Sequence, residues 1–143
     1  MAAPLNSIYV ERLEGGVFSS NTFEVDNDTP ENYNPATKAA FLWESAKVED
    51  SSVYDHSGGN TEITVTEAGS YLLVYNDNMQ SSVVRPNPKI TVEVNGEEVR
   101  GAETKTHYIR SADNHNHASA ALAFVLGDLS ANDRITVSTV REG

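Results

Sequence analysis

Two of the four histidines stand close together in a polar stretch, where they could bind a metal ion. His115 and His117 follow Asp113 in the sequence Asp-Asn-His-Asn-His. An i, i+2 pair can place both imidazole rings on one face of a strand, and imidazole and carboxylate groups are zinc ligands. A metal site needs a third ligand and supporting hydrogen bonds, and no spacing rule links His56 or His107 to the pair. These residues are weak metal candidates, so we predict no metal and no cofactor, and an exposed polar loop is the simpler interpretation.

Carboxylates recur in the turn-rich segments and raise the alternative of a calcium site. They stand at residues 26 and 28 and at Asp50, Asp55 and Asp77. Calcium prefers oxygen ligands, but the sequence lacks a twelve-residue loop with glycine at its sixth position and a closing glutamate. Scattered carboxylates of this kind are more typical of solvated loops that keep sheet edges from aggregating.

The sequence contains no recognisable catalytic motif. There is no Gly-x-Ser-x-Gly elbow, and no histidine stands in a recognisable catalytic frame. Glycoside hydrolysis needs only two carboxylates, which leaves a glycan-active enzyme open as a minor alternative. We therefore predict no catalytic residues and a protein that is not an enzyme.

The aromatic side chains suit either a core or a binding surface. Five aromatic residues could stack on a sugar or fill a partner's pocket, namely Trp43, Tyr9, Tyr33, Tyr54 and Tyr108. Such residues more often complete a core or an interface, and we predict that Trp43 is buried.

The composition limits the classes of partner. The 143 residues include 10 Lys and Arg against 21 Asp and Glu, a formal charge of −11, and there is no cysteine. Sequence-independent nucleic-acid binding needs clustered Lys and Arg, and anionic membranes repel an acidic chain. We predict one domain with no nucleic-acid partner, no membrane partner and no disulfide. The first 20 residues lack a basic region followed by an apolar run, so we expect the protein to be made and kept in the cytoplasm or to leave it without a conventional signal.

The elements that position these residues are mostly strands. Apolar and polar residues alternate in four segments, with the period of a half-buried strand. Asn95-Gly96 interrupts one of them and is the strongest short signal for a hairpin turn, because both positions accept positive φ. The four alternating segments are residues 7–13, 61–67, 89–99 and 133–140.

Two further segments are apolar on both faces. Residues 70–75 and 118–126 predict central strands buried between two layers, the second closed by Gly127-Asp128. A helix is an alternative for the second segment by composition. Over residues 39–48 a helix and a strand are equally favoured, because four apolar residues follow the spacing i, i+3, i+4, i+7.

The segment 14–38 predicts an extended N-terminal arm. Residues 25–37 are rich in turn formers and hold two prolines. Phe18, Phe23 and Tyr33 are isolated apolar anchors in this polar stretch. Ordering such a segment alone is costly, so we interpret it as an arm that binds a neighbouring subunit through these rings. A flexible terminus is the alternative.

Three stretches carry a recognisable combination of motifs. Residues 68–75 run through Gly-x-Tyr into a two-faced apolar strand, residues 90–99 hold the Asn-Gly hairpin, and residues 118–137 join a small-residue strand, a turn with Asp and an alternating strand. Together they resemble tumour-necrosis-factor-like jelly rolls, which the globular heads of the complement first component share. The residues that carry this resemblance are Gly69, Tyr71, Asn95, Gly96, Gly127 and Asp128.

The resemblance implies an all-β fold, an antiparallel β-sandwich of the jelly-roll type that assembles as a homotrimer. Near a threefold axis, clustered histidines would make a pH-sensitive feature. The family adds a strand after the one that matches residues 134–140, and we expect residues 7–13 to supply it here. We divide the chain into an N-terminal strand and extended arm, 1–38, and a jelly-roll sandwich, 39–143, within one structural domain.

These observations together predict a structural protein of a virion. Jelly rolls recur in virion proteins. The specific hypothesis is a trimeric decoration, or cement, protein on the capsid surface of a tailed bacteriophage, which binds the major capsid protein. The alternative is a receptor-binding or glycan-binding knob, or a lectin-like head, that uses the loops 76–88 and 105–117.

Overall fold

The computed structural model describes residues 6–13, 22–27, 32–80, 85–105 and 117–142. All regular structure among them is β, and the prediction of an all-β antiparallel sandwich of the jelly-roll type is confirmed. The strands are β1 (Asn6–Leu13), β2 (Thr22–Asn27), β3 (Ala39–Ala40), β4 (Val48–Glu49), β5 (Tyr54–Asp55), β6 (Ile63–Val65), β7 (Gly69–Asp77), β8 (Met79–Gln80), β9 (Pro88–Val94), β10 (Glu97–Lys105), β11 (His117–Ala118), β12 (Ala121–Leu129) and β13 (Arg134–Arg141).

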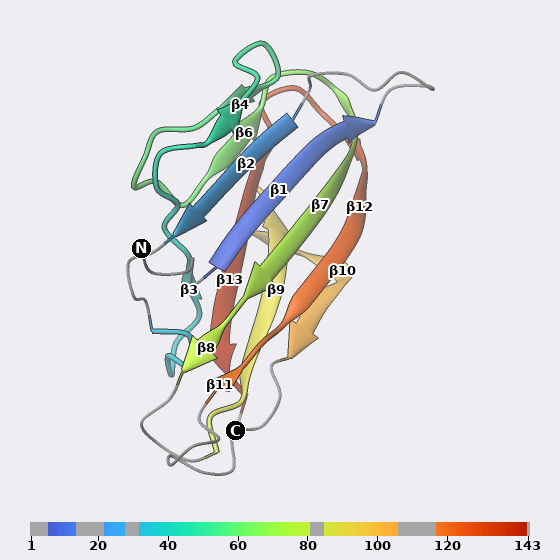
Figure 1. Cartoon of the computed structure of the whole chain (residues 1–143). Helices are drawn as coiled ribbons and strands as arrows, with labels where there is room; N and C mark the ends of the chain where they lie inside the picture. Colours follow the sequence, from blue (N-terminus) through green and yellow to red (C-terminus); the bar gives the residue numbers. More distant parts are fainter. Residues whose placement is uncertain (1–5, 14–21, 28–31, 81–84, 106–116, 143) are drawn as a thin grey trace.

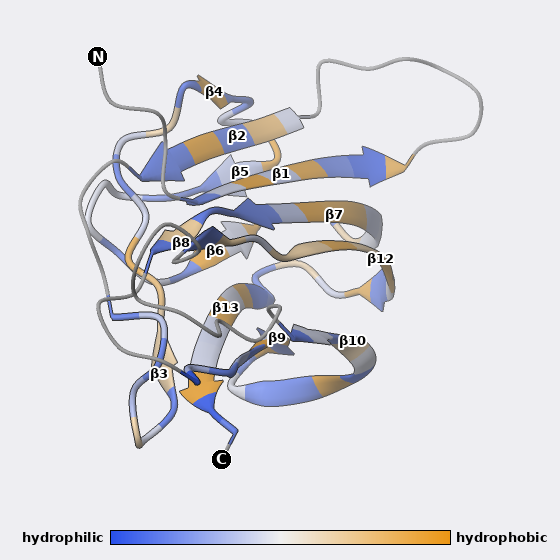
Figure 2. Ribbon diagram, turned by 60° about the horizontal axis from the view of Figure 1, so that its bottom comes forward, coloured by the Kyte–Doolittle hydropathy of each residue, from blue (hydrophilic) through white to orange (hydrophobic). Residues whose placement is uncertain are grey.

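Two sheets form the layers of the sandwich (Figures 1 and 2). The front sheet has the strand order β12-β7-β1-β2-β4, and the back sheet has the order β10-β9-β13-β6-β5 with β3 beside β13. The chain passes from one sheet to the other on both sides of β3, between β4 and β5, between β6 and β7, between β7 and β9, and on both sides of β12. A short pair, β8 with β11, lies outside both sheets.

The core between the sheets is rich in aromatic rings. Tyr75 of β7 packs on Phe41 and Trp43 at centroid distances of 5.8 and 6.4 Å. Tyr71, four residues earlier on the same face of β7, packs on Tyr54 with a ring-centroid distance of 6.0 Å. Trp43 has no exposed surface, which confirms its predicted burial.

The N-terminal segment belongs to the front sheet. The predicted strand at residues 7–13 is confirmed as β1, which pairs with β2 on one side and with β7 on the other. The arm prediction is wrong for Phe23 and Tyr33, because both rings lie in the core of their own chain. Phe23 packs on Tyr54 at 5.7 Å and Tyr33 on Phe41 at 5.2 Å. The third predicted anchor, Phe18, lies outside the described residues.

Residues 39–48 form no helix. The segment contains β3, a bridge between Trp43 and Asn60, and the start of β4. Phe41 and Trp43 point inward while Leu42 between them is 49% exposed. This alternation has the period of an extended chain, and burial of two large rings on one side outweighs the helical spacing.

The two predicted turns have different outcomes. Asn95 and Gly96 form the β9–β10 turn with φ values of 53° and 83°, so the hairpin is confirmed. Gly127-Asp128 does not end its strand. It forms an irregularity within β12, where Asp128 has φ of 53° and donates its backbone N–H to Ser70 Oγ at 3.1 Å. Such a bulge bends a strand without terminating it.

Candidate interaction surface

The histidines gather no metal site among the described residues. Asp113 and His115 lie outside them, and His117 is an exposed residue of β11 that pairs with Gln80. Both ring nitrogens of His56 lie 3.0 Å from backbone carbonyl oxygens, those of Glu62 and Glu44. No group of three His, Cys, Asp or Glu side chains in the described part of the chain could hold a metal ion.

Several carboxylates considered for calcium bind protein groups instead. Asp50 accepts hydrogen bonds from the backbone N–H and the hydroxyl of Ser52. Asp26 pairs with Lys47. Asp77 is buried and accepts hydrogen bonds from the Tyr75 hydroxyl and from a backbone N–H. These contacts give each of the three carboxylates a structural role.

The outward face of the front sheet carries an apolar strip. In the strand register, Ala123 lies opposite Val74, and Val74 lies opposite Tyr9 on the next strand. Val125, which is 51% exposed, lies opposite Leu72. Because alternate residues of a strand share a face, these side chains point away from the core. We define the apolar strip as Tyr9, Leu72, Val74, Ala121, Ala123 and Val125.

The strip shows why the prediction for residues 118–126 is wrong. We expected a central strand buried on both faces, but β12 is the edge strand of the front sheet. Its inward residue Leu126 is buried, whereas its outward residues Ala121, Ala123 and Val125 are exposed. Within the described residues, nothing in this chain covers the outer face of β12.

The part of β12 before its bulge at Gly127-Asp128 also lacks the features that protect other sheet edges. Edge strands commonly avoid association by being short, charged or bulged. In the described part of the chain, β4 and β5 have two residues each, and β10 carries charged side chains and a register shift between Glu98 and Glu103. The stretch from Ala121 to Leu126 contains no charged residue. Such an edge is a site for association.

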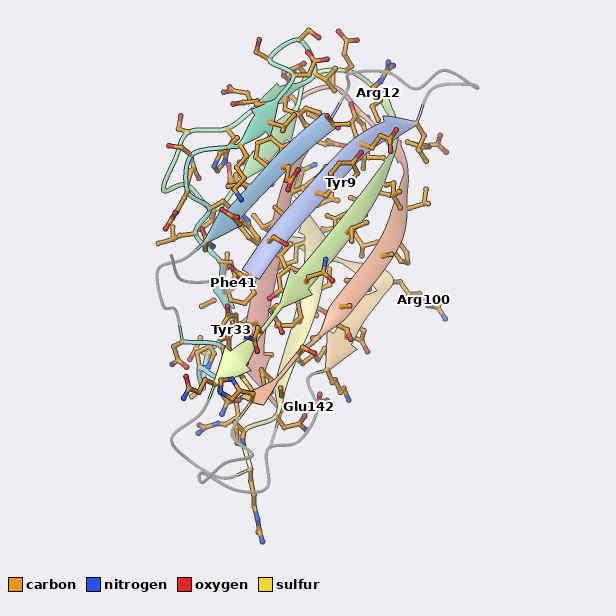
Figure 3. All side chains as sticks on the ribbon, in the orientation of Figure 1. Tyr9, Arg12, Tyr33, Phe41, Arg100 and Glu142 are labelled. Atoms are coloured by element: carbon orange, nitrogen blue, oxygen red, sulfur yellow. The ribbon has the colours of Figure 1, made fainter. Side chains whose placement is uncertain are left out.

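Carboxylates border the strip on the side of β2. The hydroxyl of Tyr9, which lies on β1 (Figure 3), donates to Glu11 Oε2 at 3.3 Å, and Glu24 of β2 lies opposite Tyr9. Burial, followed by the negative charges of Glu11 and Glu24, raises the pKa of Tyr9. The phenol therefore stays neutral and contributes an apolar ring with one hydrogen-bonding group.

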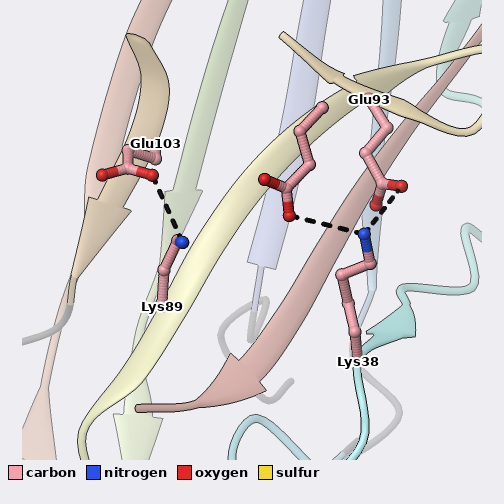
Figure 4. Close-up of polar contacts among 5 residues, drawn as sticks. Lys38, Lys89, Glu93 and Glu103 are labelled. Atoms are coloured by element: carbon pink, nitrogen blue, oxygen red, sulfur yellow. Dashed lines mark hydrogen bonds and ion pairs between the residues drawn. The ribbon is translucent and has the colours of Figure 1, made fainter. Parts of the chain in front are cut away.

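The outer face of the back sheet has the opposite character. Lys38 reaches Glu93 and Glu98 at 3.2 and 3.4 Å, and Lys89 pairs with Glu103 at 3.4 Å (Figure 4). Glu93 is buried, whereas the charged side chains of Lys38, Glu98 and Glu103 are exposed and suit contact with water. The difference between the two faces identifies the front face as the candidate interaction surface.

The fold and this surface define a β-sandwich in which the described residues leave the apolar outer face of the front sheet uncovered. No family model and no curated protein matches the sequence. Among solved structures, the chain is similar to two crystal structures of murine APRIL, at pH 8.0 and at pH 5.0. The identities are 16% and 15%, the TM-score is 0.48 for both, and the matches cover 96% and 94% of this chain and 85% and 83% of theirs. The described residues include no helix able to cross a membrane.

Proposed function

We propose that this chain is a non-enzymatic structural protein that forms a homotrimer through its front face and decorates the capsid of a tailed bacteriophage. The apolar strip, which ends at the unprotected edge of β12, is the observation that carries the proposal. Covering this strip with another protein surface is favourable by about 25 cal/mol per Å² of apolar area removed from water. An exposed apolar patch on a chain with a formal charge of −11 favours binding to a specific partner over non-specific aggregation.

Two adjoining surfaces support a ring of identical copies. The open edge of β12 and the outward face of the strip are different surfaces, so contact between the edge of one copy and the strip of the next is heterologous. Heterologous contacts close into rings when the rotation permits. Three copies is the number implied by the resemblance to tumour-necrosis-factor-like jelly rolls.

A trimer suits a decoration role because of its multivalency. Three weak contacts with the major capsid protein would act together on one shell. A protein that binds only the assembled shell stabilises that shell by mass action, without any catalytic step.

Light scattering after size exclusion tests the self-association. We expect a mass about three times the 15.5 kDa of one chain. Val125→Glu places a carboxylate on the strip and should yield a folded monomer, because burying an unpaired charge is costly. Thr64→Glu adds the same charge beside Arg134 on the back sheet and should leave the trimer intact. A wild-type monomer or dimer, or a trimeric Val125→Glu variant, would contradict the proposal.

Mass spectrometry of purified virions tests the capsid role. A decoration protein should be present in hundreds of copies per particle, and particles without it should be weaker. A few copies per particle would contradict decoration and favour a receptor-binding knob. Binding to a specific sugar on a glycan array would likewise favour the lectin-like alternative.

A further inference from the structure

The β9–β10 turn holds the most reactive asparagine dipeptide in protein chemistry. Asn95 and Gly96 are both exposed, and a Cβ added at Gly96 would meet no atom within 4 Å. In an Asn-Gly pair no side chain hinders the glycine nitrogen as it approaches the side-chain carbonyl carbon of asparagine. That approach begins spontaneous deamidation, so the exposed turn combines the reactive sequence with open space.

The side chain of Asn95 is nevertheless held by the neighbouring β12–β13 turn. Its Nδ2 donates to Asp133 Oδ1 at 2.9 Å, and its Oδ1 accepts from the backbone N–H of Arg134 at 3.0 Å. The backbone N–H of Asn95 also donates to the Arg134 carbonyl at 2.8 Å. Both polar atoms of the carboxamide therefore have partners on residues 133 and 134.

Asp133 is itself well fixed as an ionised acceptor. Its second oxygen accepts the backbone N–H of Ser130 at 2.8 Å. The hydrogen bond from Asn95, followed by the one from Ser130, lowers the pKa of Asp133. A charged acceptor makes a stronger hydrogen bond than a neutral one.

The reaction requires these contacts to break. The Gly96 nitrogen forms a bond to Asn95 Cγ, the bond from Cγ to the side-chain nitrogen breaks, and ammonia leaves with the Gly96 proton. Water then opens the cyclic imide and leaves either aspartate or isoaspartate at position 95. For the attack, the carboxamide must turn away from Asp133 and Arg134. The product carries a carboxylate in place of the donor, and this carboxylate repels that of Asp133.

We propose that Asn95 is a deamidation site that the folded chain latches through Asp133, and that its conversion releases the β9–β10 turn from the β12–β13 turn. The latch slows the reaction while the sandwich is intact. Once the reaction has occurred, the like charges keep the two turns apart. The site is independent of the apolar strip, since it involves other turns and other residues.

Peptide mapping by mass spectrometry measures the reaction in wild type, Asp133→Ala and the control Glu97→Ala, each folded and in urea. We expect folded wild type to react at least about tenfold more slowly than in urea, given the usual strength of hydrogen bonds to charged groups. Folded Asp133→Ala should approach its rate in urea, and Glu97→Ala, which removes a neighbouring carboxylate, should behave as wild type. In urea all three chains should react alike.

Two results would overturn the latch. One is a folded wild type that reacts as fast as in urea, and the other is a folded Asp133→Ala, verified by circular dichroism, that reacts as slowly as wild type. Asn95→Asp provides a second test as a mimic of one product. It should melt at a lower temperature than wild type at neutral pH, and unchanged melting would refute the release of the two turns.

Discussion

Removing the Asp77 carboxylate should destabilise the sandwich, because this group joins β7 to the start of β12. Asp77 is only 6% exposed. Its Oδ2 accepts the hydroxyl of Tyr75 and its Oδ1 accepts the N–H of Ala120, each at 2.8 Å. Its own N–H donates to the Ala120 carbonyl at 3.0 Å. The perturbation thus tests the connection that places β12, and with it the apolar strip.

The magnitude follows from the groups left without partners. In Asp77→Ala, the Tyr75 hydroxyl and the Ala120 N–H lose their acceptor, and each unsatisfied buried donor costs about 1–3 kcal/mol. We expect a total loss of about 2–4 kcal/mol after local relaxation, which lowers the melting temperature by roughly 5–15 °C. Asp77→Asn is the matched control. Its oxygen can accept from Ala120, so only the Tyr75 hydroxyl loses its acceptor and the loss should be about half that of Asp77→Ala, about 1–2 kcal/mol.

The pH dependence supplies a second readout. Burial raises the pKa of Asp77 above its ordinary value of 3.8, and this effect outweighs the hydrogen bonds from Tyr75 and Ala120. The folded state therefore holds the proton more tightly than the unfolded chain. The stabilisation is complete below the unfolded pKa and is lost as the pH rises through the folded pKa. The stability of wild type relative to Asp77→Asn should thus decrease as the pH rises from below 3.8.

Urea unfolding of the three chains across this pH range provides the assay. Equal midpoints for wild type and Asp77→Ala would refute the hydrogen-bond argument. A wild type that gains stability relative to Asp77→Asn as the pH rises would show that the hydrogen bonds outweigh burial.

Three further substitutions test other parts of the fold by thermal or urea unfolding. Gly69 has φ of 150°, and a Cβ at this position would lie 3.2 Å from Arg12 Nε. Gly69→Val should therefore lower the free energy of unfolding by about 1–3 kcal/mol, and an unchanged melting temperature would disprove the strain. His56→Phe keeps an aromatic ring near the core but loses two contacts to carbonyl oxygens, with an expected loss of about 1–3 kcal/mol that a stability equal to wild type would contradict. Lys38→Met leaves the Glu93 carboxylate, whose side chain is 7% exposed, without this cation and should cost about 2 kcal/mol. That loss should largely disappear in the Glu93→Gln background, and an equal loss there would exclude the ion pair as its cause.

Local patterns predict the strands where one face is buried and the other is polar. The alternation in β1, β6, β9 and β13 matches their observed positions, and the positive φ values of Asn95 and Gly96 match the predicted turn. In these segments the pattern and the tertiary structure agree, since each strand has one face toward the core. A residue's neighbours in sequence are then sufficient to assign its face.

The prediction of an N-terminal arm was wrong because the segment contains a short strand pattern that the turn-forming residues around it outweighed. Phe23 and Val25 alternate with Glu24 and Asp26, which is the pattern of a half-buried strand. The turn formers that follow concealed this pattern, and nothing local reveals that β2 pairs with β1. The position of Tyr33 against Phe41 likewise depends on a tertiary contact between two irregular segments.

The error at β12 has a different physical origin, and it bears directly on function. A strand with apolar residues on both faces needs a cover on both sides, and the prediction assumed that this chain supplies both. In the described residues the inner cover is the core around Leu126, while the outer residues Ala123 and Val125 meet no second layer. The outer face of the back sheet on another copy cannot supply the missing cover. Packing Lys38 or Glu103 against the apolar strip would remove these charges from water. The uncharged edge of β12 on another copy remains as the cover, so the feature that misled the strand assignment supports the proposed self-association through the front face.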